Sequence, residues 1–156
     1  MLGVDYVLDS SALIHWSRNT PRAAFPSLWD QVGLLLGQSR AVVPEEVVHE
    51  LERGTDDLAA WVKAAASPHG TTKEVLNLVK TIARRYPTWA TNGTRNGADP
   101  FVVATAVICE ATVITQEGLS RKRPASARPS IPSVCADYGL IAIGPNDLIA
   151  REGWRF

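Results

Sequence analysis

Residues 4–14 read VDYVLDSSALI, a short apolar run that ends in an acid and two serines before a second apolar run begins. We interpret residues 4–8 as a buried strand and predict that a helix begins near Ser11. Asp9 then lies at the carboxyl end of the strand. Because ligands of open parallel sheets bind outside the carboxyl ends of the strands, this stretch indicates both a fold class and a place for a site.

Short apolar runs rich in β-branched residues recur along the chain and are typical of buried parallel strands. They occupy residues 41–43, 111–115 and 139–143. Apolar residues at helical spacing separate them and predict helices over residues 12–18, 27–38, 44–54, 56–66, 72–86 and 99–110. We therefore expect one α/β domain over residues 1–156, with three layers in α/β/α order and a central parallel sheet of about four to five strands.

The composition is that of an ordinary globular protein. Hydrophobic residues make up 46% of the 156 and charged residues 21%, which suffices for a core without disulfides or structural metals. Lysine plus arginine and aspartate plus glutamate number 16 each, so net charge alone identifies no partner. Cys109 and Cys135 lie in apolar stretches and resemble small buried residues. Since neither a secretory signal nor a membrane-length apolar run is found, we expect a cytoplasmic protein without a membrane partner.

Four acids fall where strands end or helices begin in this arrangement. They are Asp9 after the first strand, Glu50 on the helix after the second, Asp99 at a helix start and Glu117 after the third strand. Gathered at one edge of the sheet, these carboxylates repel one another unless some take up protons. A divalent cation removes that repulsion, and an oxygen-only ligand set without a His or Cys cluster favours Mg²⁺ or Mn²⁺.

Each acid also has a simpler interpretation. Asp9 and Asp99 both suit the N-cap of a helix, and Pro100 suits the first helical position. Glu50 belongs to a glutamate-rich helix whose acids could all be solvated, and Glu117 precedes a glycine in what could be an ordinary turn. The metal site is therefore indicated by the four acids as a set and by none of them alone.

Four segments together resemble the motifs of PIN-domain nucleases. Residues 6–14 (YVLDSSALI) are similar to the first motif, residues 43–51 (VPEEVVHEL) to the second, residues 98–106 (ADPFVVATA) to the third and residues 113–117 (VITQE) to the fourth. The third is the most specific of the set. Residues 131–139 (IPSVCADYG) are similar to a PIN subgroup long described as a domain of unknown function. The resemblance thus extends over most of the chain.

Members of that family are metal-dependent ribonucleases, often the toxins of type II toxin–antitoxin pairs of the VapC kind. The resemblance therefore implies a PIN-like fold, a Mg²⁺ or Mn²⁺ cofactor, an RNA substrate, a cognate antitoxin protein and, since PIN domains commonly dimerise, a homodimer. It also implies site residues: catalytic and metal-binding acids at Asp9, Glu50, Asp99 and Glu117, and near-site hydroxyls at Ser11 and Thr115. Glu117 replaces the commoner Asp, which leaves open whether one or two metals bind.

Basic residues follow and precede the expected site in sequence. Arg95, Arg121, Lys122 and Arg123 are the candidates to bind RNA phosphates, although a basic triplet is also typical of a solvated loop. Trp89 is the best candidate among the tryptophans to stack on a base. The histidines near the motifs, His15 and His49, are expected to be structural or near-site polar groups rather than general bases.

The sequence lacks residues that other candidate enzyme classes require. Position 11 is serine where a haloacid-dehalogenase phosphatase carries its second aspartate, and neither a P-loop nor a GxGxxG motif occurs. The alternative that stays open is a PIN-like fold without catalysis, which would bind RNA or another protein. Metal binding by the wild type that is lost in Asp9→Asn would distinguish a functional metal site from one that has lost its function.

Overall fold

A parallel sheet lies at the centre of the computed structural model, which describes residues 3–90, 97–117 and 129–156. Within those ranges the sheet has four strands in the order β2-β1-β3-β4, and every pairing is parallel. The strands are β1 (Tyr6–Leu8), β2 (Ala41–Val42), β3 (Thr112–Ile114) and β4 (Ala142–Ile143). The two central strands are buried along their whole length, as expected of a parallel sheet covered on both faces.

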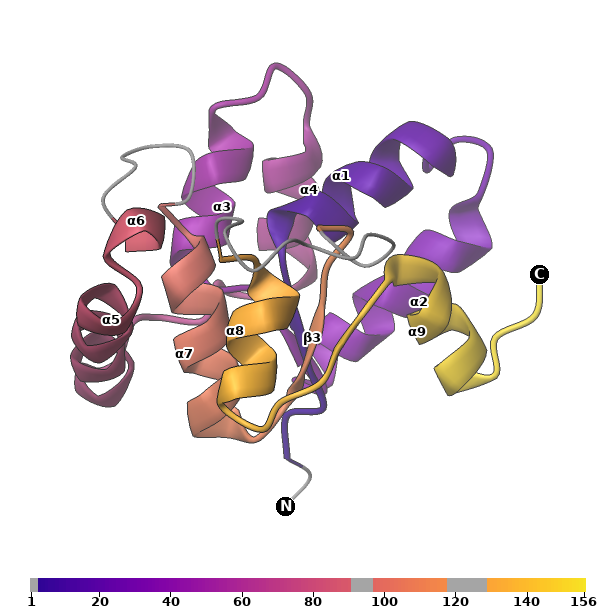
Figure 1. Ribbon diagram of the computed structural model, residues 1–156. Coiled ribbons are helices and arrows are strands. Elements are labelled where there is room, and N and C mark those ends of the chain that lie inside the picture. The colour runs from indigo at the N-terminus through magenta and orange to yellow at the C-terminus, as the bar shows by residue number, and fades with distance from the viewer. Residues whose placement is uncertain (1–2, 91–96, 118–128) are drawn as a thin grey trace.

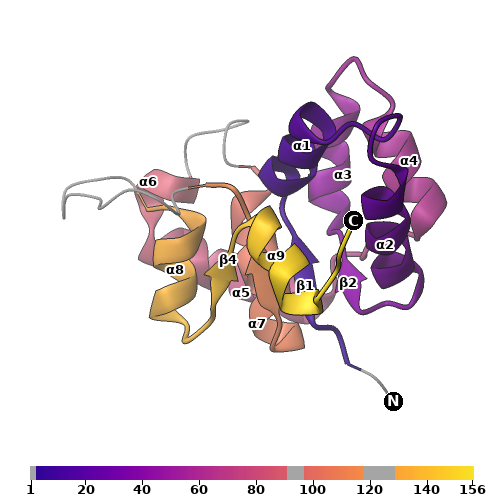
Figure 2. The same cartoon turned by 90° about the vertical axis from the view of Figure 1, so that its right-hand side faces the viewer.

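Helices cover both faces of the sheet. The described helices are α1 (Ser10–Asn19), α2 (Pro26–Gly37), α3 (Glu45–Glu52), α4 (Leu58–Ala65), α5 (Lys73–Arg85), α6 (Pro87–Ala90), α7 (Asp99–Cys109), α8 (Ile131–Asp137) and α9 (Pro145–Glu152). Figures 1 and 2 show α7 and α8 on one face, with α5 outside α7, and α1, α2 and α9 on the other face. α3 and α4 pack against α1 and against each other. The expected three-layer α/β/α architecture with a central parallel sheet is confirmed.

The most enclosed helix is α7, which contacts β1, β3, α5 and α8. Four of its residues, Val102, Val103, Ala104 and Ala106, are fully buried. A helix that is apolar on nearly all sides is expected to occupy such a place in the core. Across the described ranges, no helix combines the length and the apolar character needed to cross a lipid bilayer.

Several boundaries differ from the sequence-based expectation. The last strand is shorter than residues 139–143, because Gly139 adopts a left-handed φ of 72° just after α8, a conformation typical of glycine beyond a helix end. Pro44 is the N-cap of α3 rather than its first residue, and Ala98 rather than Asp99 is the N-cap of α7. The short helices α8 and α9, of seven and eight residues, were not predicted, since two turns establish no clear helical period.

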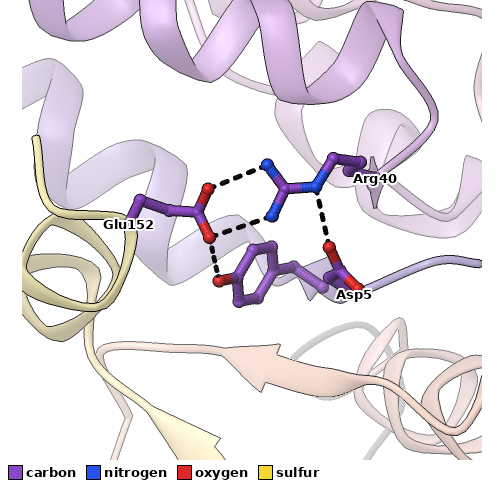
Figure 3. Close-up of polar contacts among 4 residues, drawn as sticks. Asp5, Arg40 and Glu152 are labelled. Carbon is purple, nitrogen blue, oxygen red and sulfur yellow. Dashed lines mark hydrogen bonds and ion pairs between the residues drawn. The ribbon is translucent and has the colours of Figure 1, made fainter. Parts of the chain in front are cut away.

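One guanidinium joins the segment before β1 to the end of α9 (Figure 3). Arg40, which precedes β2, donates from Nη1 and Nη2 to the two carboxylate oxygens of Glu152 at 2.9 and 3.0 Å, and from Nε to Asp5 Oδ2 at 2.8 Å. The Tyr6 hydroxyl also donates to Glu152. We call these four residues the Arg40 clamp. Its bidentate geometry is the strongest form of an arginine–carboxylate contact.

Candidate active site

Asp9 and Thr115 lie side by side at the carboxyl ends of the two central strands. Leu8 pairs with Ile114 in the sheet, so the next residue of each strand meets its neighbour. The Asp9 amide donates to the Ile114 carbonyl at 3.0 Å, and the Thr115 hydroxyl donates to Asp9 Oδ2 at 2.9 Å. Ser11 donates to the same oxygen at 2.6 Å. The hydroxyls that the resemblance placed near the site therefore hold the Asp9 carboxylate in one orientation.

Asp9 is only 2% exposed, and one of its two carboxylate oxygens has no hydrogen-bond partner among the described residues. No described residue offers a hydrogen bond to Oδ1. Burial raises the pKa of Asp9 above its ordinary value, and the hydroxyls of Ser11 and Thr115, together with the backbone amides of Ser10 and Ser11, oppose that rise in part. A buried carboxylate oxygen without a donor is unfavourable. A proton, a bound water molecule or a bound cation would satisfy it.

The chain that leads to Glu117 is bonded to the same hydroxyls. Ser11 Oγ and Thr115 Oγ1 lie 3.1 Å apart. The Gln116 amide donates to Ser11 Oγ at 3.0 Å, and the Glu117 amide donates to Thr115 Oγ1 at 3.1 Å. Glu117 is half-buried and lines a surface hollow together with Ser11. The structure thus brings the backbone of Glu117 next to the groups that hold Asp9.

Glu50 is held in place from two directions. Its Oε2 accepts from Ser10 Oγ at 2.8 Å, and its Oε1 accepts from the Ala98 amide at 3.1 Å. Since Ala98 immediately precedes Asp99, this contact draws Glu50 on α3 to the start of α7. Asp99 itself is buried. The bond to Ser10 connects this pair to the Asp9 region, because Ser10 follows Asp9 directly in the chain.

The four predicted acids therefore belong to two linked pairs. Asp9 lies with the segment that carries Glu117, and Glu50 lies with the segment that carries Asp99. Within the described ranges, no group of three or more His, Cys, Asp or Glu side chains is arranged to hold a metal ion. The structure brings the acids to one edge of the sheet without gathering three of them around one point.

The residues at this edge nevertheless suit a hard divalent cation. Mg²⁺ usually keeps several waters and binds through one or two carboxylates, so a cage of three acids is not required. Asp9 Oδ1 supplies one oxygen without a competing donor, and each oxygen of Glu50 retains a second lone pair beyond the hydrogen bond that it accepts. The neighbouring groups are hydroxyls, which are further oxygen donors. These oxygen ligands match a hard cation better than a soft or imidazole-preferring one.

A Thr115 variant measures how much these hydrogen bonds contribute to the free energy of unfolding. Replacing it by Val keeps the shape but removes the donor to Asp9 and the acceptor for the Glu117 amide. We expect the free energy of unfolding to fall by about 1–2 kcal/mol, as measured by urea denaturation. Thr112→Val on the same strand is the matched control, because no hydrogen bond of its hydroxyl is found among the described residues. Equal losses in both variants would contradict the role of the Thr115 hydroxyl.

Trp89 was predicted to stack on bases, and the structure shows this to be wrong. Its side chain is 1% exposed and its ring meets that of Tyr86 edge to face, with centroids 6.4 Å apart. A ring enclosed in this way offers no face to a ligand. The four candidate phosphate contacts, Arg95, Arg121, Lys122 and Arg123, lie outside the described residues.

Sequence reasoning missed the part that Ser10 plays. It noted the residue only as a small hydroxyl beside Asp9, whereas its bond to Glu50 spans 40 positions in the chain. The one signal available was the pair of serines directly after a strand end. Such a pair can serve two different carboxylates, because successive side chains at a helix start point in different directions.

Comparison with known families covers all of these residues. A family model described as "Domain of unknown function (DUF4411)" matches residues 6–156, a stretch that includes all four acids and the hydroxyls around Asp9. No curated protein matches the sequence. Because the match extends over far more than half of the chain, the protein belongs to the DUF4411 family.

Proposed function

We propose that this protein is a metal-dependent endoribonuclease that hydrolyses RNA phosphodiester bonds at the acidic edge of its sheet. The observation that carries the proposal is the buried Asp9 carboxylate, whose Oδ1 has no partner among the described residues. Buried carboxylates with a raised pKa cluster at functional sites, and that of Asp9 is raised by burial. The motifs similar to those of PIN-domain nucleases supply the reaction class.

Each side chain of the proposed site has a separate role. Asp9 and Asp99 would hold Mg²⁺ or Mn²⁺, because short acids at a strand end and a helix start are rigidly placed. Glu50, fixed by Ser10 and the Ala98 amide, would orient the attacking water, and Glu117 would bind through water from the edge of the site. When bound, the cation lowers the pKa of water and stabilises charge on the phosphate. Ser11 and Thr115 keep the Asp9 carboxylate in its orientation.

We extend the proposal to the biological role. The protein acts as the toxin of a type II toxin–antitoxin pair, in the cytoplasm, with a cognate antitoxin as its protein partner and with a second copy as its dimer partner. The support is the similarity of its motifs to VapC-type toxins. Expression of the wild type in a bacterial host should stop growth, whereas Asp99→Asn should not; growth inhibition of equal strength by both would contradict the role.

A second function is supported by the burial of Asp9. Burial raises the pKa of Asp9, which fits a PIN-like module that binds RNA or a protein without cleaving it. In that case Asp9 would be protonated, and its Oδ1 would need no cation.

Cleavage of a mixed single-stranded RNA pool by the purified protein separates the two. With Mn²⁺ or Mg²⁺ we expect cleavage that EDTA abolishes and that Asp99→Asn lowers by at least about 100-fold, because residues that only support a metal ligand already cost 10–100-fold. The products are resolved by gel electrophoresis. Folded wild type that leaves the pool intact with metal present would favour the binding module.

A further inference from the structure

The outward face of α1 extends away from the acidic site. Ser11, Ile14, His15 and Arg18 follow one another at i, i+3, i+4 and i+7, the spacing of one helix face. Ser11 contacts Asp9 at the start of this stripe, and Arg18 lies two turns further along, about 10 Å away by helical rise. The opposite face is the buried one, with Ala12, Leu13 and Trp16 in the core. We call Ser11, Ile14, His15 and Arg18 the α1 stripe.

Two surface hollows flank the α1 stripe and reach the proposed site from either side. One is lined by Glu50 and Asp56, the other by Ser11 and Glu117, and both include Ile14 and Arg18. Their volumes are about 210 and 390 Å³, several times the roughly 30 Å³ that a water molecule occupies. Of the described basic residues that line the two hollows, Arg18 is shared by both, and the predicted acids Glu50 and Glu117 line one hollow each.

The Arg18 side chain is exposed. No carboxylate lies within ion-pair distance of it among the described residues. Its neighbour Arg22, by contrast, is paired with Asp57 at 2.5 Å, and Arg40 is held by the clamp. An arginine that makes no ion pair with the described residues, next to a proposed phosphodiester site, presents a fork of donors that matches phosphate oxygens.

His15 presents a donor on the same face. The Asn19 amide nitrogen donates to the His15 carbonyl at 2.9 Å, which fixes the orientation of that amide. The same nitrogen lies 3.3 Å from His15 Nδ1. Because an amide nitrogen only donates, Nδ1 accepts and the ring proton resides on Nε2. His15 lines the hollow that contains Glu117, so its Nε2–H group is a hydrogen-bond donor beside the site.

We propose that the α1 stripe binds the single-stranded RNA substrate next to the cleaved bond, with Arg18 on a phosphate and His15 Nε2–H on the sugar or base. This inference rests on the proposed ribonuclease function and adds the path of the strand. The acids at the site repel a phosphate backbone, and the Arg18 cation two turns away offsets that repulsion. Both contacts are positioning contacts rather than catalytic ones.

Binding of a labelled single-stranded RNA of about 12 nucleotides, a length that single-strand grooves can cover, tests the inference. Fluorescence anisotropy in EDTA measures affinity without cleavage. We expect Arg18→Gln to weaken binding about three- to fivefold and to reduce the slope of log K against log salt concentration by about 0.7, the value for one phosphate contact on a single strand. His15→Ala should weaken binding without changing that slope.

Lys80→Gln is the matched control, because Lys80 is an exposed cation on α5, on the other flank of the molecule (Figure 1). It removes the same charge and should leave affinity and slope unchanged. Equal effects of Arg18→Gln and Lys80→Gln would overturn the assignment of Arg18. If the wild type cleaves RNA with metal but Arg18→Gln keeps the wild-type affinity, KM and salt slope, the strand path is wrong and the nuclease stands. If the wild type neither binds nor cleaves RNA, both proposals fall.

Discussion

Asp9→Asn is expected to abolish RNA cleavage while leaving the metal-free protein at least as stable as the wild type. The loss of activity should be at least about 1,000-fold, because a directly bound cation contributes several kcal/mol to the barrier and each 1.4 kcal/mol is a factor of ten. Stability should not fall, because the substitution removes a buried charge whose Oδ1 has no donor among the described residues and keeps an oxygen for Ser11 and Thr115.

The same variant separates metal binding from folding. Wild-type protein with Mn²⁺ at about 100 times its dissociation constant should gain about 2.7 kcal/mol, which raises Tm by roughly 5–10 °C for a domain of this size. Asp9→Asn should show no such shift. Asp30→Asn, which removes an exposed acid from α2, should keep both the shift and the cleavage. Metal-dependent cleavage by folded Asp9→Asn would remove Asp9 from the site.

A destabilised Asp9→Asn would also be informative. In the absence of metal, a loss of several kcal/mol would mean that the ionised carboxylate is compensated by contacts other than the two hydroxyl bonds. Thermal unfolding in EDTA, followed by circular dichroism, gives that number directly. Stability and activity that fall together would make Asp9 a structural residue and would weaken the nuclease proposal.

The position of Asp9 was predictable from sequence because it depends on local signals. An acid directly after a buried apolar strand must lie at the sheet edge, and parallel pairing then places the end of the neighbouring strand beside it. The prediction of Asp9 needed only a strand boundary that was correct to within one residue. Thr115 was placed near the site only by the resemblance to PIN domains, because the predicted strand over residues 111–115 included it, whereas β3 ends at Ile114 and leaves Thr115 beside Asp9.

The contacts of Glu50 were not predictable in this way. They join α3 to Ser10 and to the Ala98 amide, and such contacts depend on how three helices pack around the sheet. Trp89 illustrates the same limit in the opposite direction. Its polar sequence neighbours indicated exposure, whereas α6 turns the ring into the core. Burial is a property of tertiary packing, and a local pattern reports it only for residues on a regular strand or helix face.

Arg40→Met is expected to lower the free energy of unfolding by about 2–3 kcal/mol, which corresponds to a fall in Tm of roughly 4–12 °C. The substitution removes three charge-assisted hydrogen bonds and leaves Glu152, whose side chain is only 12% exposed, without its main partner. Removing one partner of a fully buried pair costs 3–5 kcal/mol. The smaller value reflects the partial exposure of Arg40 and Asp5, at 29% and 48%.

Lys63→Met is the matched control. It breaks the ion pair with Glu52, in which both side chains are nearly half exposed and the charged atoms lie 3.6 Å apart. Pairs of this kind contribute less than about 1 kcal/mol. Urea unfolding of both variants beside the wild type measures the difference. Equal and small losses in the free energy of unfolding would mean that the Arg40 clamp contributes no more to stability than an ordinary surface ion pair.

The clamp also predicts how stability changes with pH. The hydrogen bonds from Arg40 lower the pKa of Glu152 below its ordinary value of 4.5, so its contribution is complete above that value and is lost as the pH falls through the lowered pKa. Burial and the bond to Glu152 raise the pKa of Tyr6 from 10.0 to about 12. The contribution of Tyr6 to the free energy of unfolding is therefore complete below pH 10.0 and is lost as the pH rises towards 12.

Glu152→Gln should make the fall in Tm at low pH less steep, as measured by thermal unfolding across pH 3 to 6. If Tm falls as steeply with decreasing pH in Glu152→Gln as in the wild type, other carboxylates cause the acid sensitivity, and the Arg40 clamp contributes little to stability.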